Sequence, residues 1–494
     1  MLFLTIDQGT TSTRALVIDS NENTLGLGQQ AIVQHYPNNG WVEHDPEQIW
    51  QSTLDSCQLA IASAVDDVSQ LAALAITNQR ETVVLWDRQT GKPVYNAIVW
   101  QDRRTDDYCD ALKAQGHESY IQSTTGLLLD PYFSASKINW LLDNIEGARE
   151  RAEAGELAVG TIDCFLVWRL TNGQSHITDA TNASRTSLFD IHQQCWDEKL
   201  LDIFNIPEAI LPTVVDNSGA LAVCDQQHFG LPLAIKAMIG DQQSALIGQG
   251  CVETGLAKST FGTGSFLMLN TGDVAAISEH RMLTTVAFRL SGQLSFAIEG
   301  SLFCAGSTMD WLRDKLQIID HIGDIEPLVK KRSDSRGVYL VPAFTGLGAP
   351  YWQPKVNAAL VGMTLDSDRA DVVTAALQSV VYQTQELLML MAEEGVAPQL
   401  LAVDGGMVAN SWMCQFLSDM LAIPVVRPRQ LEATALGAAR LAMLACGVIE
   451  ALPVGGRGEA RSFDATMSDS QRQHNLQGWQ RALIAARSMD PSHC

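Results

Sequence analysis

A short polar segment between two apolar runs is the first part of the chain that could do chemistry. Residues 3–19 read FLTIDQGTTSTRALVID, with one carboxylate (Asp7), one glycine and a row of hydroxyls between two strand-like stretches. A glycine turn followed by hydroxyls presents N–H and O–H donors toward one point, which suits phosphate oxygens. Asp7 could hold Mg²⁺ beside them, because Mg²⁺ commonly bridges carboxylates and phosphates. Taken alone, a polar hairpin with threonines favoured by β propensity is the alternative.

Two glycine-containing turns in the second half have a similar character. One is TFGTGSF (260–266), and the other is VDGGMVAN (403–410), in which a strand ends at Asp404 and a helix begins near Ser411. A strand, two glycines and a helix N-terminus let ribose and phosphate approach the backbone closely, although a tight connection without a ligand fits equally well. Thr10 and Thr263 lie about half the chain apart, which hints at two related domains.

The familiar nucleotide motifs are absent. TGLAKST (254–260) lacks the glycine that a P-loop needs before its lysine. GLGQQA (26–31) fits GxGxxA by letter, but it follows a hairpin signal and no helix is expected there.

Candidates for the side that accepts a phosphoryl group follow strand-like runs. Arg80 and Glu81 come after LAALAIT (71–77) and could bind neighbouring hydroxyls of a polyol. Asp241 follows AIKAMIG (234–240), where a carboxylate can take the proton of an attacking alcohol. Each residue alone is as compatible with a surface ion pair or a helix cap.

The elements that would position these residues are strands and helices in alternation. The first thirty residues predict an antiparallel meander, and further strands are expected at 71–77, 82–87, 97–100 and 234–240. A helical stripe runs from Val373 to Met391 after the capping segment DSDRAD. The pattern predicts α+β or α/β domains, with a boundary near 248–254.

Composition limits the classes of function. The chain has 494 residues, 46% hydrophobic and 18% charged, which predicts a globular protein of two large domains. A formal net charge of −23 disfavours nucleic acid and anionic membranes as partners. The ten cysteines form no CxxC pair, and we expect buried thiols in a cytoplasmic protein without membrane insertion.

Together these segments resemble the FGGY carbohydrate kinases of the actin-like ATPase superfamily. The resemblance runs in order from residue 3 to about residue 450 and is carried by DQGTTSTR, GWVEHDP, TNQRET, YNAIVWQ, DPYFSASK, TDATNASRT, GDQQSALIGQ, TFGTG, VPAFTGLGAPYW and VDGGMVAN. It implies an α/β fold of two ribonuclease-H-like domains, 1–250 and 251–494, with a shared cleft. It also implies ATP-dependent phosphorylation of glycerol to sn-glycerol 3-phosphate, with Mg²⁺, in a cytoplasmic transferase of glycerol catabolism that forms a homodimer or homotetramer.

The resemblance also implies roles for residues. Asp7 would hold Mg²⁺, and Asp241 would be the general base. Nucleotide contacts would come from Thr10, Thr11, Ser12, Arg14, Gly262, Thr263, Gly306, Asp310, Gly406 and Asn410, with Asp310 standing where relatives usually carry glutamine. Glycerol would be bound by Arg80, Glu81, Trp100, Tyr132, Asp241, Gln242 and Phe266.

Three rival readings follow from the same motifs. An actin-like or chaperone-type ATPase would need no polyol pocket, and a pentulose kinase would need a roomier one than Trp100 and Phe266 indicate. A catalytically dead binding module would have lost Asp7 or Asp241, and both are present.

Overall fold

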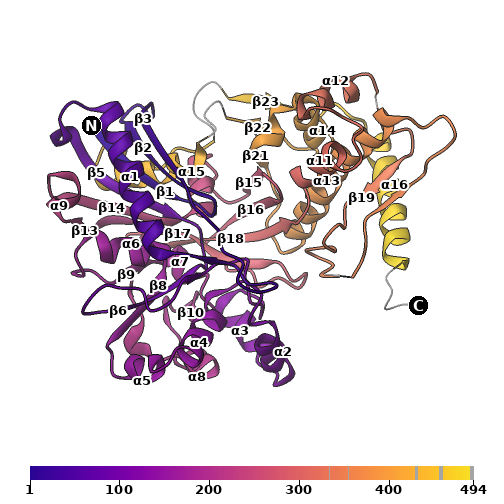
Figure 1. The fold of residues 1–494 in the computed structure, drawn as a ribbon. Coiled ribbons are helices and arrows are strands. Elements are labelled where there is room, and N and C mark those ends of the chain that lie inside the picture. Colours follow the sequence, from indigo (N-terminus) through magenta and orange to yellow (C-terminus); the bar gives the residue numbers. More distant parts are fainter. Residues whose placement is uncertain (333, 354, 429–431, 456–459, 490–494) are drawn as a thin grey trace.

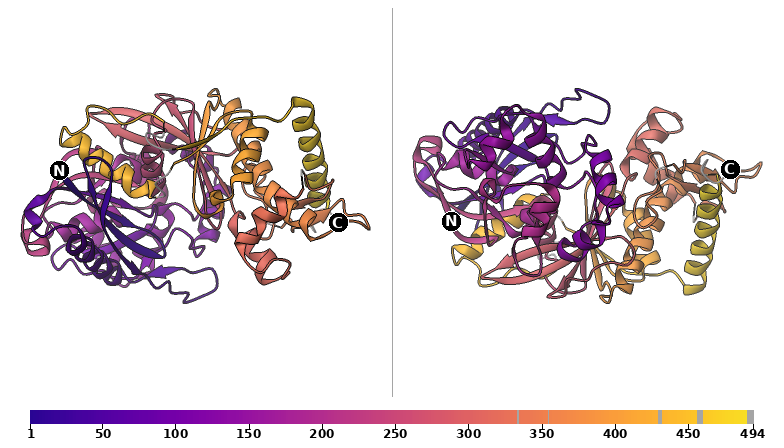
Figure 2. Two further views of the ribbon diagram at one scale, coloured as in Figure 1. Left: turned by 90° about the horizontal axis from the view of Figure 1, so that it is seen from above. Right: turned by 90° about the horizontal axis from the view of Figure 1, so that it is seen from below.

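The structure, a computed structural model, describes residues 1–332, 334–353, 355–428, 432–455 and 460–489. It has two lobes, each built around one large sheet (Figure 1). We call the lobe around the six-stranded sheet the first lobe and the lobe around the seven-stranded sheet the second lobe. In the views from above and below, the two lie side by side, with α16 (Asp469–Ser488) at the far edge of the second lobe (Figure 2).

The first sheet has the order β13-β14-β5-β1-β2-β3. Its first three strands form the expected antiparallel meander, β5 runs parallel to β1, and β14 runs parallel to β5. The strands are β1 (Leu2–Gln8), β2 (Ser12–Asp19), β3 (Thr24–Ala31), β5 (Leu71–Asn78), β13 (Ser218–Cys224) and β14 (Leu233–Gly240).

Helices cover both faces of the first sheet, which explains why β1 is buried along almost its whole length. Leu4 and Ile6 belong to one core cluster, shared with α1 (Pro46–Ala64) and α6 (Ile162–Leu170). Phe3 belongs to a cluster on the opposite face, shared with α10 (Asp241–Gly248) and α15 (Ala433–Ala445). A strand buried on both faces reads as a continuous apolar run.

The second sheet has the order β17-β18-β16-β15-β21-β22-β23. Its central part repeats the first sheet: β15 is antiparallel to β16, β16 is antiparallel to β18, and β15 is parallel to β21. The strands are β15 (Leu256–Phe261), β16 (Ser265–Gly272), β17 (Leu283–Leu290), β18 (Gln293–Leu302), β21 (Leu400–Asp404), β22 (Val425–Arg427) and β23 (Arg461–Phe463). This repetition confirms the predicted α/β class with two related sheets.

The helical stripe after DSDRAD is α13 (Arg369–Glu393), and Asp368 caps it together with Asp371 in a capping box. α13 shares one core with the other helices of the second lobe: α11 (Gly306–Asp314), α12 (Ile325–Lys330), α14 (Ser411–Leu421) and α16.

Residues between β5 and β14, together with the short strand β4 that precedes β5, form an additional unit at the base of the first lobe (Figure 1). It contains the sheet β4-β7-β6-β8 and the helices around it. The elements are β4 (Glu43–His44), β6 (Val83–Asp87), β7 (Ala97–Ile98), β8 (Leu157–Thr161), α2 (Asp106–Ala114), α3 (Glu118–Thr125), α4 (Ser134–Asn144), α5 (Ala148–Glu153) and α8 (Glu198–Phe204). The strand expected over 97–100 stops at Ile98, because the Trp100 N–H donates to Thr82 Oγ1 (3.2 Å) and leaves the ladder.

α15 comes late in the sequence but lies on the first sheet (Figure 1). It crosses α10 at two glycines: a Cβ at Gly437 would lie 1.8 Å from Ser244 O, and one at Gly248 would lie 1.8 Å from Ala433 O. The first lobe therefore receives a segment from residues beyond 250, and the predicted boundary at that residue stays a prediction.

Of the nine cysteines in the described residues, all are free and seven are buried. The expectation of buried thiols is wrong for Cys195, which is exposed, and Cys494 lies outside the described residues. In the described part of the chain, no helix combines the length and apolarity needed to cross a bilayer.

Candidate active site

The polar segment at residues 9–12 is a tight turn between β1 and β2. The Gly9 N–H donates to Ser12 O (3.0 Å), and Thr10, Thr11 and Ser12 are half-buried or exposed and so accessible to a ligand. Arg14 lies just inside β2 and donates to Asp7 Oδ2 (2.5 Å) and to Glu432 Oε2 (2.6 Å). Burial raises the pKa of Asp7, and the Arg14 guanidinium opposes this rise. The turn thus places donors, one carboxylate and one cation together.

Two neighbouring strands of the same sheet end beside this turn. β5 leads into Arg80 and Glu81, and β14 leads into Asp241 at the start of α10. Asp7 pairs with Thr77, and Gly240 pairs with Asn78, so the carboxyl ends of β1, β5 and β14 are in register. Glu81 has a φ of 60°, a conformation that costs a non-glycine residue energy and is seen mainly at functional positions.

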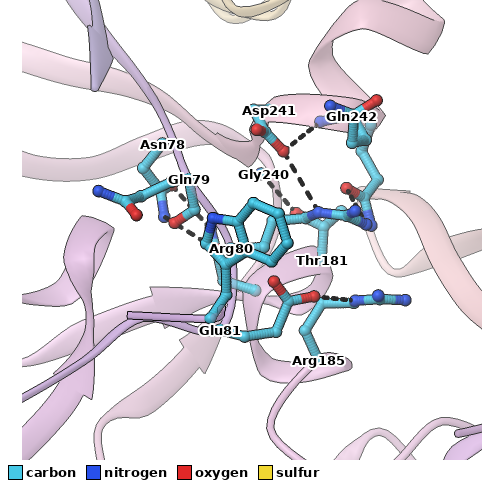
Figure 3. A network of polar contacts seen from close by, with 12 residues as sticks. Asn78, Gln79, Arg80, Glu81, Thr181, Arg185, Gly240, Asp241 and Gln242 are labelled. Carbon is cyan, nitrogen blue, oxygen red and sulfur yellow. Dashed lines mark hydrogen bonds and ion pairs between the residues drawn. The ribbon is translucent and has the colours of Figure 1, made fainter. Parts of the chain in front are cut away.

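These strand ends belong to one chain of alternating charges, and Figure 3 shows its two outer pairs, Asp241 with Arg80 and Glu81 with Arg185. Arg80 Nε lies 3.2 Å from Asp241 Oδ1, and Arg185 Nε donates to Glu81 Oε1 (2.6 Å). Glu299 joins the two arginines: its Oε2 accepts from Arg80 Nη1 (2.6 Å) and its Oε1 from Arg185 Nη2 (3.1 Å). Neither Arg80 nor Glu81 is a surface ion pair, because both side chains are 2% exposed.

Asp241 is the accessible end of the charge chain. Its side chain is 28% exposed, and its Oδ1 accepts from the Gln242 N–H (2.7 Å). Burial raises the pKa of Asp241, whereas Arg80 and Lys258 lower it and Asp7 raises it further. A carboxylate with a raised pKa that stays open on one side is suited to accept a proton from a ligand.

Three aromatic rings contact one another next to Arg185 of this charge chain, and one of them comes from the second lobe. The Trp100 ring centroid is 5.6 Å from that of Tyr132 and 6.3 Å from that of Phe266, both in edge contacts. Trp100 Nε1 also donates to Thr10 Oγ1 (3.0 Å), which ties the aromatic group to the β1–β2 turn. The structure therefore brings the predicted acceptor residues together with the predicted phosphate turn.

The second lobe contributes three loops that meet through glycines. The Gly306 N–H donates to Gly262 O (2.9 Å), and a Cβ at Gly306 would lie 2.6 Å from that oxygen. A Cβ at Gly405 would lie 2.3 Å from Phe261 O. These contacts place the β15–β16 turn, the start of α11 and the β21 end side by side, so Gly262, Thr263, Gly306 and Gly406 lie on adjoining loops.

Two predicted nucleotide residues have other partners. Asp310 is exposed and forms an ion pair with Arg313 (3.0 Å), and Asn410 Oδ1 caps α14 by accepting from the Met413 N–H (3.1 Å). Among the described residues, no contact joins Asp310 or Asn410 to the residues predicted to bind the phosphoryl acceptor, and the roles of both remain predictions.

Lys258, on β15 of the second lobe, is a buried cation that contacts the start of α10 in the first lobe. Its Nζ donates to Gln242 Oε1 and to Thr260 Oγ1 (3.2 Å). Burial lowers its pKa to about 8, while Asp404 and Asp241 oppose that change. Asp404 in turn accepts from Gln249 Nε2 (2.7 Å).

Sequence reasoning did not single out Glu299, Arg185 or Lys258 as site residues. The sequence does contain a signal for two of them, a single charged residue within a strand. Glu299 is the one charged residue of FAIEGSL, and Lys258 is the one charged residue of LAKSTF. A charge inside a buried strand must have a partner, and only the fold identifies that partner.

Comparisons with known proteins identify the family to which this chain belongs. Residues 2–248 match the model of the FGGY family of carbohydrate kinases, N-terminal domain, and residues 257–446 match that of the C-terminal domain. Glycerol kinase 1 of Pseudomonas aeruginosa is 51% identical over 98% of this chain and 99% of its own length. The glycerol kinase of Alcanivorax borkumensis is 52% identical over 97% of each chain.

Solved structures give the same picture. A crystal structure of Plasmodium falciparum glycerol kinase with ADP superposes with a TM-score of 0.92 at 34% identity, covering 98% of both chains. A xylulose kinase from Brucella ovis shares the fold, with a TM-score of 0.86 at 21% identity over 100% of this chain and 99% of its own.

Proposed function

The chain belongs to the FGGY family of carbohydrate kinases, and we propose that it transfers the γ-phosphoryl group of ATP to a terminal hydroxyl of glycerol. The observation that carries this proposal is the half-open Asp241 carboxylate, 3.2 Å from Arg80, in a charge chain whose Arg185 also contacts the cluster of Tyr132, Trp100 and Phe266. Full-length identity of about one half to glycerol kinases supports the choice of acceptor.

The acceptor pocket combines apolar and polar walls, as a small triol requires. The Trp100 and Phe266 rings would cover the C–H side of glycerol, while Arg80, Glu81 and Gln242 would bind its hydroxyls. A site that hydrogen-bonds every hydroxyl rejects analogues lacking one, because its own buried polar groups would be left unpaired. Tyr132, whose ring contacts that of Trp100, would narrow the pocket against larger sugars.

Asp241 would accept the proton of the attacking hydroxyl. Phosphoryl transfer needs little covalent chemistry from the protein beyond positioning, charge neutralisation and this base. Arg80, 3.2 Å from Asp241, would hold the carboxylate in place. The aromatic rings would limit the access of water, which competes for the same phosphoryl group.

The β1–β2 turn and the β15–β16 turn would hold the triphosphate from opposite lobes. Backbone N–H groups and hydroxyls of residues 9–12 and of Gly262 and Thr263 are the donors on each side. Gly306, Asp310, Gly406 and Asn410 would lie along the nucleoside. Closure of the lobes around both substrates would complete the site and exclude solvent.

The residues present also fit Mg²⁺. Asp7, near the end of β1, would hold the ion, and Mg²⁺ is commonly bound by one or two carboxylates plus substrate phosphates. In the described residues there is no cluster of three or more metal-ligating side chains, which matches an ion held largely by its substrate. When bound, Mg²⁺ would neutralise charge on the phosphates.

A coupled assay of ADP release tests the proposed function. The purified protein is given ATP, Mg²⁺ and one of glycerol, dihydroxyacetone, xylulose or no acceptor. We expect the highest kcat/KM with glycerol and negligible release without an acceptor. A preference for xylulose, or ADP release that ignores the acceptor, would contradict the proposal.

A further inference from the structure

Glu299 comes from the second lobe, yet its carboxylate lies among charged groups of the first. It stands on β18, and its side chain is 2% exposed. One oxygen accepts from Arg80 and the other from Arg185, at 2.6 and 3.1 Å. Burial alone would raise the pKa of Glu299, but the two guanidinium groups hold it at about 2, so the carboxylate is ionised at neutral pH.

The two arginines that Glu299 binds contact most of the polar acceptor residues. Arg80 approaches Asp241 through Nε, and Arg185 donates through Nε to Glu81. The Arg185 guanidinium carbon also lies 5.6 Å from the centroid of the Tyr132 ring. One carboxylate from the second lobe therefore stands behind Asp241, Glu81 and Tyr132 at once.

We propose that Glu299 is a positioning residue for the acceptor site, which orients Arg80 and Arg185 so that Asp241 and Glu81 keep free oxygens for the acceptor hydroxyls. This inference rests on the proposed function. A guanidinium group is a planar fork that pairs in two-pronged fashion with any available carboxylate. Glu299 accepts from Nη1 of Arg80 and from Nη2 of Arg185, and each arginine meets its other carboxylate through Nε.

Charge balance gives a second reason for Glu299. Arg80 and Arg185 face three carboxylates, those of Asp241, Glu81 and Glu299. Lys258 has Asp404 as a further anionic partner. Without the Glu299 charge, Arg80 and Arg185 each keep one carboxylate partner, and Arg80 is free to close on Asp241. Asp241 would then be a weaker base, because a tighter cation lowers its pKa.

Replacement of Glu299 by glutamine tests this inference, because Glu299→Gln preserves size and removes the charge. We expect kcat/KM for glycerol to fall about 100-fold, as for a small misplacement of catalytic groups. The acidic limb of the pH profile of kcat/KM should move to lower pH. Of the groups that act on Asp241 (Arg80, Lys258 and Asp7), Arg80 would gain influence, and a closer cation lowers the pKa of Asp241. ADP affinity measured without acceptor should stay within about twofold of wild type.

Two further variants separate positioning from a merely structural role. Glu299→Asp keeps the charge but is one methylene too short to reach both arginines, so an intermediate loss is expected. Glu386→Gln is the matched control: it neutralises another buried second-lobe glutamate, which accepts from Tyr351 and Gln480 (both 2.8 Å) away from the acceptor group. We expect it to leave kcat/KM for glycerol and its pH profile unchanged.

Three results would overturn the inference: a Glu299→Gln variant with unchanged kcat/KM for glycerol, an unmoved acidic limb, or an equal loss in ADP affinity. If Glu299→Gln does not fold, a Glu299→Asp variant with wild-type kcat/KM would also refute it. The kcat/KM of wild type and variant is compared on every acceptor of the panel. A wild-type preference for another acceptor would contradict the proposed function, and the role of Glu299 would then be judged on that preferred acceptor.

Discussion

Replacing Asp241 with asparagine isolates proton acceptance from shape. Asparagine keeps the size of the side chain and can still accept the Gln242 N–H bond of 2.7 Å. Arg80, 3.2 Å from that same oxygen, loses the charge of its partner but keeps Glu299 at 2.6 Å, so its position should hardly change. The main loss is therefore the base itself.

The expected magnitude follows from that separation. A positioned general base contributes about 10² to 10⁴ in rate, which corresponds to about 3–5 kcal/mol of barrier. We expect Asp241→Asn to lower kcat by this factor, with little change in ADP affinity.

Stability should change in the opposite direction. The folded-state pKa of Asp241 is raised, so the stability that its protonated form contributes is present below the ordinary pKa of 3.8 and is lost as pH rises through the raised value. At pH 7 the wild type carries that cost and Asp241→Asn does not. The variant should thus unfold at an equal or higher temperature.

The coupled assay measures kcat, an ADP titration measures the affinity for ADP, and thermal unfolding at pH 7 measures stability. Asp110→Asn, a change on an exposed helix surface, serves as the control. The reasoning is refuted if Asp241→Asn keeps more than about a tenth of wild-type kcat, well above the range for a lost base.

Two other predictions address the lysine and the lobe contact. Since burial holds the pKa of Lys258 at about 8, wild-type kcat/KM should decline above that pH as the cation is lost. In Lys258→Arg, whose charge persists, a pH profile of kcat/KM should show no such decline. If the decline is the same in the variant, Lys258 is not the group that causes it. Gly437→Ala should lower the free energy of unfolding by about 1–3 kcal/mol in a urea titration, since its Cβ would meet Ser244 O. Gly323→Ala is the control, because a Cβ at Gly323 would lie in open space. Equal effects of the two substitutions would contradict the close packing of α15 against α10.

The local elements could largely be predicted from the sequence. The meander at residues 2–31, the strand before Arg80 and the strand before Asp241 are present in the structure because period-two and continuous apolar patterns report burial directly. Helix α13 begins where its capping carboxylates predict. The glycine and hydroxyl turn needs no long-range information either, because its shape depends on neighbouring residues.

Only the tertiary structure decided how distant charges pair. Glu299 and Lys258 are single charges in separate strands, and nothing local indicates that one joins Arg80 to Arg185 while the other meets Gln242. The same holds for α15, whose place on the first sheet depends on glycines that admit α10 from far away in the sequence. Local patterns report whether a residue is buried, whereas the identity of a buried ion's partner is set by which strands the fold brings side by side.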